Sequence, residues 1–178
     1  TEYPGQVLGC DWGSAKSVEE EVDGFIYFGS GDFHPKGIAL STGKRVITVE
    51  PESGHFEFLD FDINDFMKKR YAMIENAKSA ESFGILVSSM RGQRRLDLAN
   101  SLADKLFEKG YNAYILSMRE IKPEGIQDYR LGAYINTACP RIPFEDAGSY
   151  DKPILTPFEA RVLLDEKNFD SYEIDEIG

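Results

Sequence analysis

Hydrophobic residues occur along this chain in short runs separated by polar turns, the pattern of alternating strands and helices. The clearest part predicts a βαβ unit. Residues 83–87 form a continuous apolar run, as expected of a parallel strand covered on both faces. Residues 96–107 then repeat apolar positions at helical spacing, Gly110 is placed to end that helix, and residues 113–116 form the next strand.

The pattern continues beyond this unit. Residues 121–129 predict a short helical crossover, residues 131–135 a buried strand, and residues 154–156 another strand followed by a helix over residues 157–164. The tail, residues 166–178, is acidic, and we expect it to be loosely held.

The first part of the chain predicts a second, smaller unit. Residues 25–28 form a strand, a helix is expected over residues 35–40, and residues 44–49 and 55–59 alternate as a hairpin. An amphipathic helix over residues 63–79 marks the boundary between the units. The fold class is therefore α/β, with two consecutive Rossmann-like α/β/α units and mainly parallel sheets. The predicted divisions are residues 1–79, 80–165 and 166–178.

Two cysteines follow apolar runs in similar settings. Cys10 ends the run that begins at Gln6, and Cys139 follows the run that begins at Leu131, with Pro140 stopping the strand. A further strand begins at the same interval after each cysteine. We therefore expect both thiols at the C-terminal ends of strands in two copies of one unit, facing a shared site. The alternative is two unrelated buried thiols, since unpaired cysteine is often a core residue.

Composition narrows the functional classes. The chain has 178 residues, a formal net charge of −11 and a pI of about 4.7, which argues against a nucleic-acid-binding surface. No apolar run approaches the length of a membrane span, and the first residues lack the features of a signal peptide. Two cysteines are too few for a secreted disulfide scaffold, so we expect a cytoplasmic location. A strand-like run begins at Gln6 with nothing before it to start a sheet, which suggests the C-terminal part of a longer protein.

Three further segments are candidates for binding or catalysis. Ser88, Gly92 and Gln93 lie in a strand-to-helix turn suited to an anion, although the full phosphate-binding patterns are absent and an ordinary turn is the alternative. His34 follows a glycine pair after a strand, and is either a base or a loop histidine with satisfied hydrogen bonds. Arg141 lies near Glu145, and either forms a structural ion pair or binds a carboxylate.

Four motifs occur in one order: GQVLGCD (residues 5–11), YFGSGDFHP (27–35), TACPR (137–141) and KPILTPFEA (152–160). Together they resemble the radical-SAM enzymes of diphthamide biosynthesis, archaeal type. The resemblance implies a three-domain pseudo-repeat around a central [4Fe–4S] cluster, with one cysteine from each domain. This sequence lacks the family's first domain, its cysteine and the early part of the middle domain.

The resemblance also implies chemistry. S-adenosylmethionine (SAM) binds the iron that three thiolates leave open, a carbon–sulfur bond is cleaved, and a 3-amino-3-carboxypropyl radical adds to a histidine of translation elongation factor 2. Cys10 and Cys139 are then cluster ligands. Ser88, Gly92 and Gln93 are expected in the SAM pocket, with Arg141 and His34 in the same cavity. The expected partners are the elongation factor and a second copy of the protein, with no nucleic acid and no membrane.

Three other functions compete with this one. Quinolinate synthase is also a three-domain, three-cysteine cluster protein, but a dehydratase. A non-catalytic partner subunit would use a cluster only to pass electrons. A flavodoxin-like binding module would hold no cluster.

Overall fold

The computed structural model describes residues 3–177, so residues 1, 2 and 178, at the ends of the predicted divisions, lie outside the described residues. The chain forms two compact units, Thr1–Met67 with Glu176–Gly178 (unit 1) and Lys68–Asp175 (unit 2). The division lies within helix α3 (Ile63–Ala77), earlier than the predicted boundary at residue 79. The reason is that Ile74 and Ala77, near the end of α3, are part of the core of unit 2.

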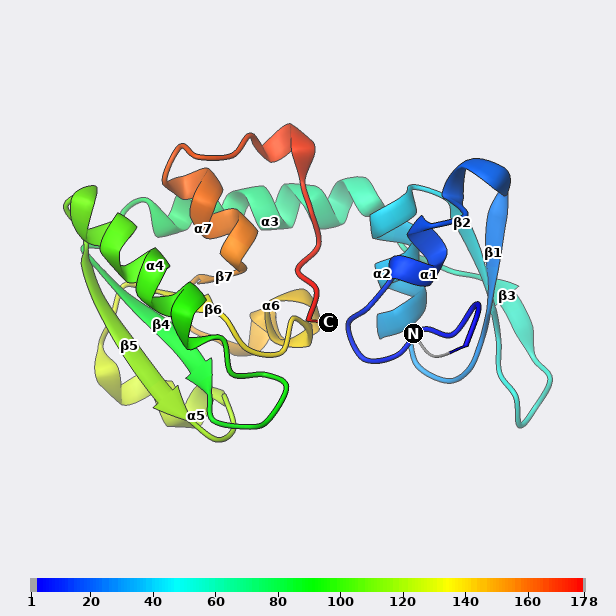
Figure 1. Cartoon of the computed structure of the whole chain (residues 1–178), viewed down its shortest axis with the longest axis horizontal. Coiled ribbons are helices and arrows are strands. Elements are labelled where there is room, and N and C mark those ends of the chain that lie inside the picture. The colour runs from blue at the N-terminus through cyan, green and yellow to red at the C-terminus, as the bar shows by residue number, and fades with distance from the viewer. Residues whose placement is uncertain (1–2, 178) are drawn as a thin grey trace. The chain divides into compact units, whose positions relative to one another are not determined.

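Unit 1 contains a three-stranded sheet in the order β1-β2-β3 (Figure 1). β1 (Gly24–Phe28) and β2 (Arg45–Val49) are parallel and are joined by α2 (Phe33–Thr42), whereas β3 (Phe56–Phe58) pairs antiparallel with β2. The predicted strand and hairpin are confirmed. The short helix α1 (Gly13–Lys16) and the 3₁₀ helix η1 (Glu19–Glu21) precede β1.

The two faces of the unit 1 sheet differ. Val46 points to the face on which α2 packs and is buried, and Tyr27 on the same face contacts His34 of α2. The strand register puts two apolar rows on the opposite face. These rows are Ile26, Ile47 and Phe58, and Phe28, Val49 and Phe56. Four of the six side chains are 66–72% exposed: Ile26, Phe28, Phe56 and Phe58.

The expected strand before Cys10 is wrong. Residues 6–10 form no extended strand in the structure; Leu8 and Asp11 make an isolated antiparallel bridge, and Cys10 makes another with Ile177. The physical reason is Gly9, whose φ of 63° is left-handed and turns the chain immediately before the cysteine. Cys10 therefore lies in a loop that leads into α1.

Unit 2 contains a four-stranded, fully parallel sheet in the order β5-β4-β6-β7. Its strands are β4 (Ser82–Ser88), β5 (Asn112–Met118), β6 (Ala133–Asn136) and β7 (Ile154–Leu155). The predicted α/β fold with parallel strands is confirmed. The α-helices between and after the strands are α4 (Leu96–Glu108), α5 (Pro123–Ile126), α6 (Arg141–Glu145) and α7 (Pro157–Leu163), and the 3₁₀ helices are η2 (Gln127–Tyr129), η3 (Ala147–Ser149) and η4 (Phe169–Ser171).

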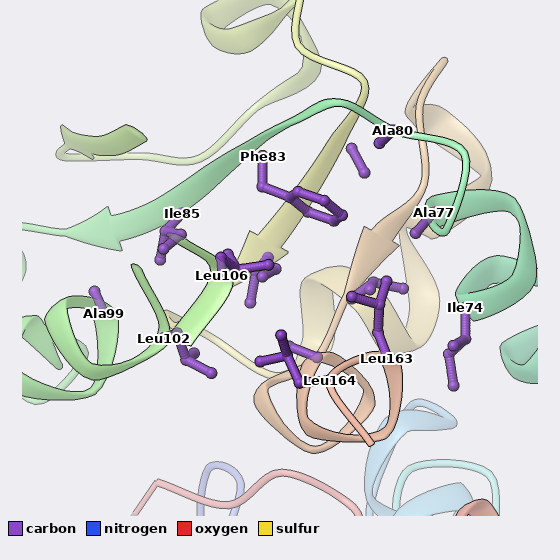
Figure 2. Packing of buried hydrophobic residues seen from close by; sticks show 14 of the residues in the cluster. Ile74, Ala77, Ala80, Phe83, Ile85, Ala99, Leu102, Leu106, Leu163 and Leu164 are labelled. Carbon is purple, nitrogen blue, oxygen red and sulfur yellow. The ribbon is translucent and has the colours of Figure 1, made fainter. Parts of the chain in front are cut away.

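Helices cover both faces of this sheet. On one face, side chains of β4 point toward those of α4, α7 and the end of α3, as the labelled residues in Figure 2 show. Phe83, Ile85, Leu102 and Leu106 of this cluster are at most 1% exposed. The alternate β4 residue Leu86 packs on the other face with Ile126, Tyr134 and Ile154. This two-sided burial explains why β4 is a continuous apolar run.

A buried ion pair connects the elements of unit 2. Arg70 of α3 is 3% exposed and Glu159 of α7 is fully buried. Arg70 donates from Nε to Glu159 Oε1 at 2.7 Å, and its other nitrogens donate to the carbonyl oxygens of Pro143 and Ile154. Glu159 also completes a capping box with Thr156 and accepts from the Tyr172 hydroxyl at 2.9 Å. Nearly every polar atom of the pair has a partner, as a buried pair requires.

The tail is more ordered than the sequence predicts, so the expected loose tail is wrong for the described residues. Within unit 2, Phe169 stacks edge-to-face on Tyr71, and Tyr172 packs on Phe158. Within unit 1, Glu176 pairs with Lys16 at 2.7 Å. The cause is the aromatic content of the tail, which the acidic composition conceals. None of the helices that the structure describes combines the length and apolar character needed to traverse a bilayer.

Candidate functional site

The carboxyl ends of β4 and β6 form a topological switch point in unit 2. From β4 the chain passes to β5 on one side and then returns to β6 on the other side of β4. In open parallel sheets, ligands bind in the crevice outside such a pair of strand ends. Cys139 lies three residues after the end of β6, so its predicted place at a strand end is confirmed.

Local hydrogen bonds fix the loop that carries Cys139. Asn136, the last residue of β6, accepts from the Ala138 N–H at 3.3 Å and donates to the Cys139 carbonyl at 2.9 Å. The Thr137 hydroxyl donates to the Leu86 carbonyl of β4 at 2.8 Å. Asn136, Thr137 and Ala138 are buried, whereas Cys139 itself is only half-buried. A well-defined backbone therefore presents a thiol at the switch point.

Arg95 is a site residue that the sequence did not predict. It lies at the N-cap of α4 and donates to the carbonyl oxygens of Thr137, at 2.7 Å, and Ala138, at 3.3 Å. Both carbonyls belong to the loop before Cys139. Arg95 also forms a two-pronged ion pair with Asp175. A signal existed, since a cation at a helix N-terminus is disfavoured by the helix dipole and indicates a partner elsewhere.

The three residues predicted to bind a cofactor lie at the end of β4, where Ser88 is the last strand residue, and in the turn that follows, which contains Gly92 and Gln93. The Ser88 hydroxyl donates to the Arg119 carbonyl at 3.0 Å and accepts from the Met90 N–H, so this buried side chain stabilises the turn. Gly92 has a φ of 79° and is exposed, and the Gln93 N–H donates to the Met90 carbonyl. All three residues lie at the carboxyl end of β4, the strand adjacent to β6, which precedes Cys139. Gly92 and Gln93 remain candidates for ligand contact.

Arg141 forms an ion pair with Glu145 one turn later in α6. The hydrogen bond that Arg141 donates to the Glu145 carboxylate raises the pKa of Arg141 above its ordinary value, and the Arg141 side chain is 60% exposed. This geometry favours the structural interpretation of Arg141. Its position two residues after Cys139 nevertheless keeps a cation beside the thiol loop.

In unit 1, His34 contacts the loop that carries Cys10. His34 Nε2 lies 3.1 Å from the Gly9 carbonyl oxygen, and because a carbonyl only accepts, Nε2 carries the proton. Nδ1 lies 3.3 Å from the Tyr27 hydroxyl oxygen, which also lies 3.4 Å from the Ser30 carbonyl oxygen. The Trp12 indole N–H donates to the His34 carbonyl. His34 therefore positions the residue before Cys10, and its ring nitrogens are both engaged.

The donor chemistry of the two cysteines fits an iron–sulfur cluster, because thiolates are the usual ligands of such clusters. Both cysteines are thiols of intermediate exposure. Residues 3–177 contain no group of three or more His, Cys, Asp or Glu side chains arranged to hold a metal ion. The chain thus offers thiolate ligands of the right kind but fewer than a complete cluster site uses.

Comparison with known proteins identifies the family. Residues 1–174 match the family described as "Putative diphthamide synthesis protein". The chain is 38% identical over 175 residues to the 2-(3-amino-3-carboxypropyl)histidine synthase of Pyrococcus horikoshii, and 33% identical over 177 residues to that of Methanocaldococcus jannaschii. Both alignments cover 98% of this chain but 49% and 50% of the relatives.

Solved structures agree with the sequence relatives. The chain superposes on the crystal structure of Dph2 from Pyrococcus horikoshii with a 4Fe-4S cluster with a TM-score of 0.83 and 37% identity. A second Dph2 structure from that organism gives a TM-score of 0.85. Each match covers 98% of this chain and 49% of that one, so the chain spans about half the length of these relatives. On this evidence, which decides against the quinolinate-synthase-like alternative, the chain belongs to the diphthamide synthesis family.

Proposed function

We propose that the protein containing this chain transfers the 3-amino-3-carboxypropyl group of SAM to a histidine of translation elongation factor 2. The observation that carries the proposal is the family match over residues 1–174, which includes a thiol at the switch point of a parallel sheet. The relatives are named as synthases of the corresponding modified histidine.

Cys10 and Cys139 are proposed as two thiolate ligands of one [4Fe–4S] cluster, with the remaining protein ligand supplied from outside this sequence. The cysteine content of the chain and the cluster named for the Dph2 relative support this assignment. When bound, the cluster supplies the electron that cleaves a carbon–sulfur bond of SAM. The task of this chain is to orient the cluster and SAM and to exclude water from them.

A role for each candidate residue is proposed from its position and its contacts. Gly92 and Gln93 are proposed to line the SAM pocket, because their turn follows β4 at the sheet edge that carries Cys139. Ser88 acts on the pocket only through the shape of this turn. Arg141 is proposed to balance negative charge near the cluster, and His34 to orient the Cys10 loop. By the family resemblance, we propose that the protein works in the cytoplasm as a homodimer. Light scattering of the full-length protein tests whether it is a dimer.

A transfer assay tests the proposed function. Full-length protein, anaerobically reconstituted and reduced with dithionite, is incubated with SAM labelled in the aminocarboxypropyl group and with elongation factor 2. We expect label on the factor, none on a factor whose target histidine is replaced, and none with Cys139→Ser. A protein that binds the cluster and passes electrons without labelling the factor would instead be the non-catalytic partner subunit.

A further inference from the structure

We propose that Arg95 and Asp175 form a positioning pair that fixes the Cys139 loop for cluster binding. The inference rests on the proposed function, since it assigns Cys139 as a ligand. It concerns residues of unit 2 that no family motif described above contains.

The contacts of Arg95 are directed at the residues before the thiol. Its Nε donates to the Thr137 carbonyl at 2.7 Å, and a terminal nitrogen donates to the Ala138 carbonyl at 3.3 Å. The two peptide groups leading to Cys139 are therefore both held by one guanidinium. Only arginine offers this planar arrangement of several hydrogen-bond donors, because a lysine ammonium cannot present the same set.

Asp175 holds the other side of the guanidinium. Its two carboxylate oxygens accept from the two terminal nitrogens of Arg95, one at 2.9 Å and one at 2.5 Å. The side chains of Arg95 and Asp175 are 21% and 11% exposed. Burial raises the pKa of Asp175, and the contact with Arg95 opposes that shift. Asp175 leaves the Arg95 plane one orientation, in which the remaining donors face the loop.

The pair is better explained by positioning than by stability. A largely buried ion pair is often no more stabilising than apolar residues of the same volume. Asp175 holds Arg95, and the carbonyl groups that Arg95 contacts lie immediately before Cys139, a proposed cluster ligand. A loop fixed before the cluster arrives avoids the entropy of ordering it on binding.

The test compares Arg95→Gln, Arg95→Lys and Asp175→Asn in the full-length protein. Arg94→Gln is the matched control, because it removes the same charge from the adjacent, exposed position. The first readout needs no cluster: the alkylation rates of Cys139 and Cys10 by iodoacetamide in the metal-free protein, measured by peptide mass spectrometry. The second is the iron content and the electron paramagnetic resonance spectrum after reconstitution.

We expect Arg95→Gln and Arg95→Lys to raise the Cys139 alkylation rate about tenfold, the factor for losing one charge-assisted hydrogen bond. Asp175→Asn raises it less, and Arg94→Gln leaves it unchanged. Cys10 serves as the internal reference. The same order is expected for the loss of iron and for changes in the resonance signal.

Unchanged Cys139 alkylation in the Arg95 variants would overturn the proposal. So would an equal increase at Cys10, because that result signals general unfolding and not a selective effect on the loop. If the alkylation rates change as expected but the wild-type protein binds no cluster, the positioning of the loop stands and the proposed function fails.

Discussion

The two cysteine loops present the same chemical group by different structural means. Cys139 follows a strand at the centre of a parallel sheet, and Asn136 and Arg95 fix the backbone around it. Cys10 follows no strand; a left-handed glycine precedes it, and His34 and the bridge to Ile177 hold its loop. The position of Cys139 is therefore set by the sheet, whereas that of Cys10 depends on a few polar contacts.

The units around the two cysteines also differ, because the sheet of unit 2 is more completely covered than the sheet of unit 1. The unit 2 sheet is covered on both faces, and its buried ion pair connects α3, α6, β7 and α7. The unit 1 sheet carries four largely exposed apolar side chains on one face. Burial on two faces supplies more of the hydrophobic free energy that stabilises a unit. We therefore expect unit 2 to be the more stable support for its thiol.

The largest effect should follow from breaking the buried pair in unit 2. Glu159→Gln leaves the Arg70 guanidinium buried without its counter-charge, and we expect a loss of about 3–5 kcal/mol in the free energy of unfolding. Urea denaturation measures it. Lys105→Gln, which breaks an exposed pair with Glu166, should cost less than about 1 kcal/mol. Equal effects of the two substitutions would mean that burial does not distinguish these pairs.

A second effect concerns the turn after β4. Gly92→Leu should weaken SAM binding about tenfold and leave the cluster intact, because a bulky side chain blocks close approach to the backbone. Gly92→Asn is the control, since asparagine tolerates the observed left-handed φ while adding less bulk. Calorimetry measures both affinities. An unchanged affinity in the leucine variant would remove Gly92 from the SAM pocket.

A smaller effect is expected in unit 1. His34→Ala removes the hydrogen bond to the Gly9 carbonyl, which is worth about 1 kcal/mol, so the alkylation rate of Cys10 should rise about fivefold. His55→Ala, in the exposed hairpin, should change nothing. Cys139 should react at the wild-type rate in both variants. A rate increase shared by both cysteines would show that the loops are not independently held.

A further effect is a pH dependence of the stability of unit 2. Burial raises the pKa of Tyr150 to about 12 and that of Tyr172 well above its ordinary value. The unfolded chain loses these protons near pH 10, before the folded chain does. The stabilisation is therefore complete below about pH 10 and is lost as the pH rises toward 12. Urea midpoints at pH 9 and pH 11 should differ more in the wild type than in Tyr150→Phe with Tyr172→Phe; an equal difference would refute this assignment.

Sequence reasoning succeeded where local pattern decides the structure. The apolar run of β4 and the helical spacing of α4 predicted the βαβ unit, and the strand before Cys139 was found from its apolar residues. It failed where the conformation of a single residue or a tertiary contact decides. The left-handed conformation of Gly9 interrupts a run that looked like a strand, and Tyr172 anchors a tail whose charge suggested disorder.

The site could likewise be predicted only in part from the sequence. Cys139, Gly92 and Gln93 follow strands and were named from the sequence, as was Cys10, which follows no strand. Arg95 and Asp175 are 80 residues apart along the chain, so only the folded structure shows them in contact. The motif of residues 152–160 contains Glu159 and was recognised in the sequence, but the pairing of Glu159 with Arg70 of α3 was not.

The iron content of the reconstituted protein tests the central claim most directly, namely that both cysteines are ligands of one cluster. We expect about four irons per chain in the full-length wild type, the stoichiometry of a complete site, and clearly fewer in Cys10→Ser, in Cys139→Ser and in residues 1–178 alone. Full iron content with an unchanged resonance spectrum in either serine variant would contradict the account. So would about four irons in residues 1–178 alone, because this sequence contains only two cysteines.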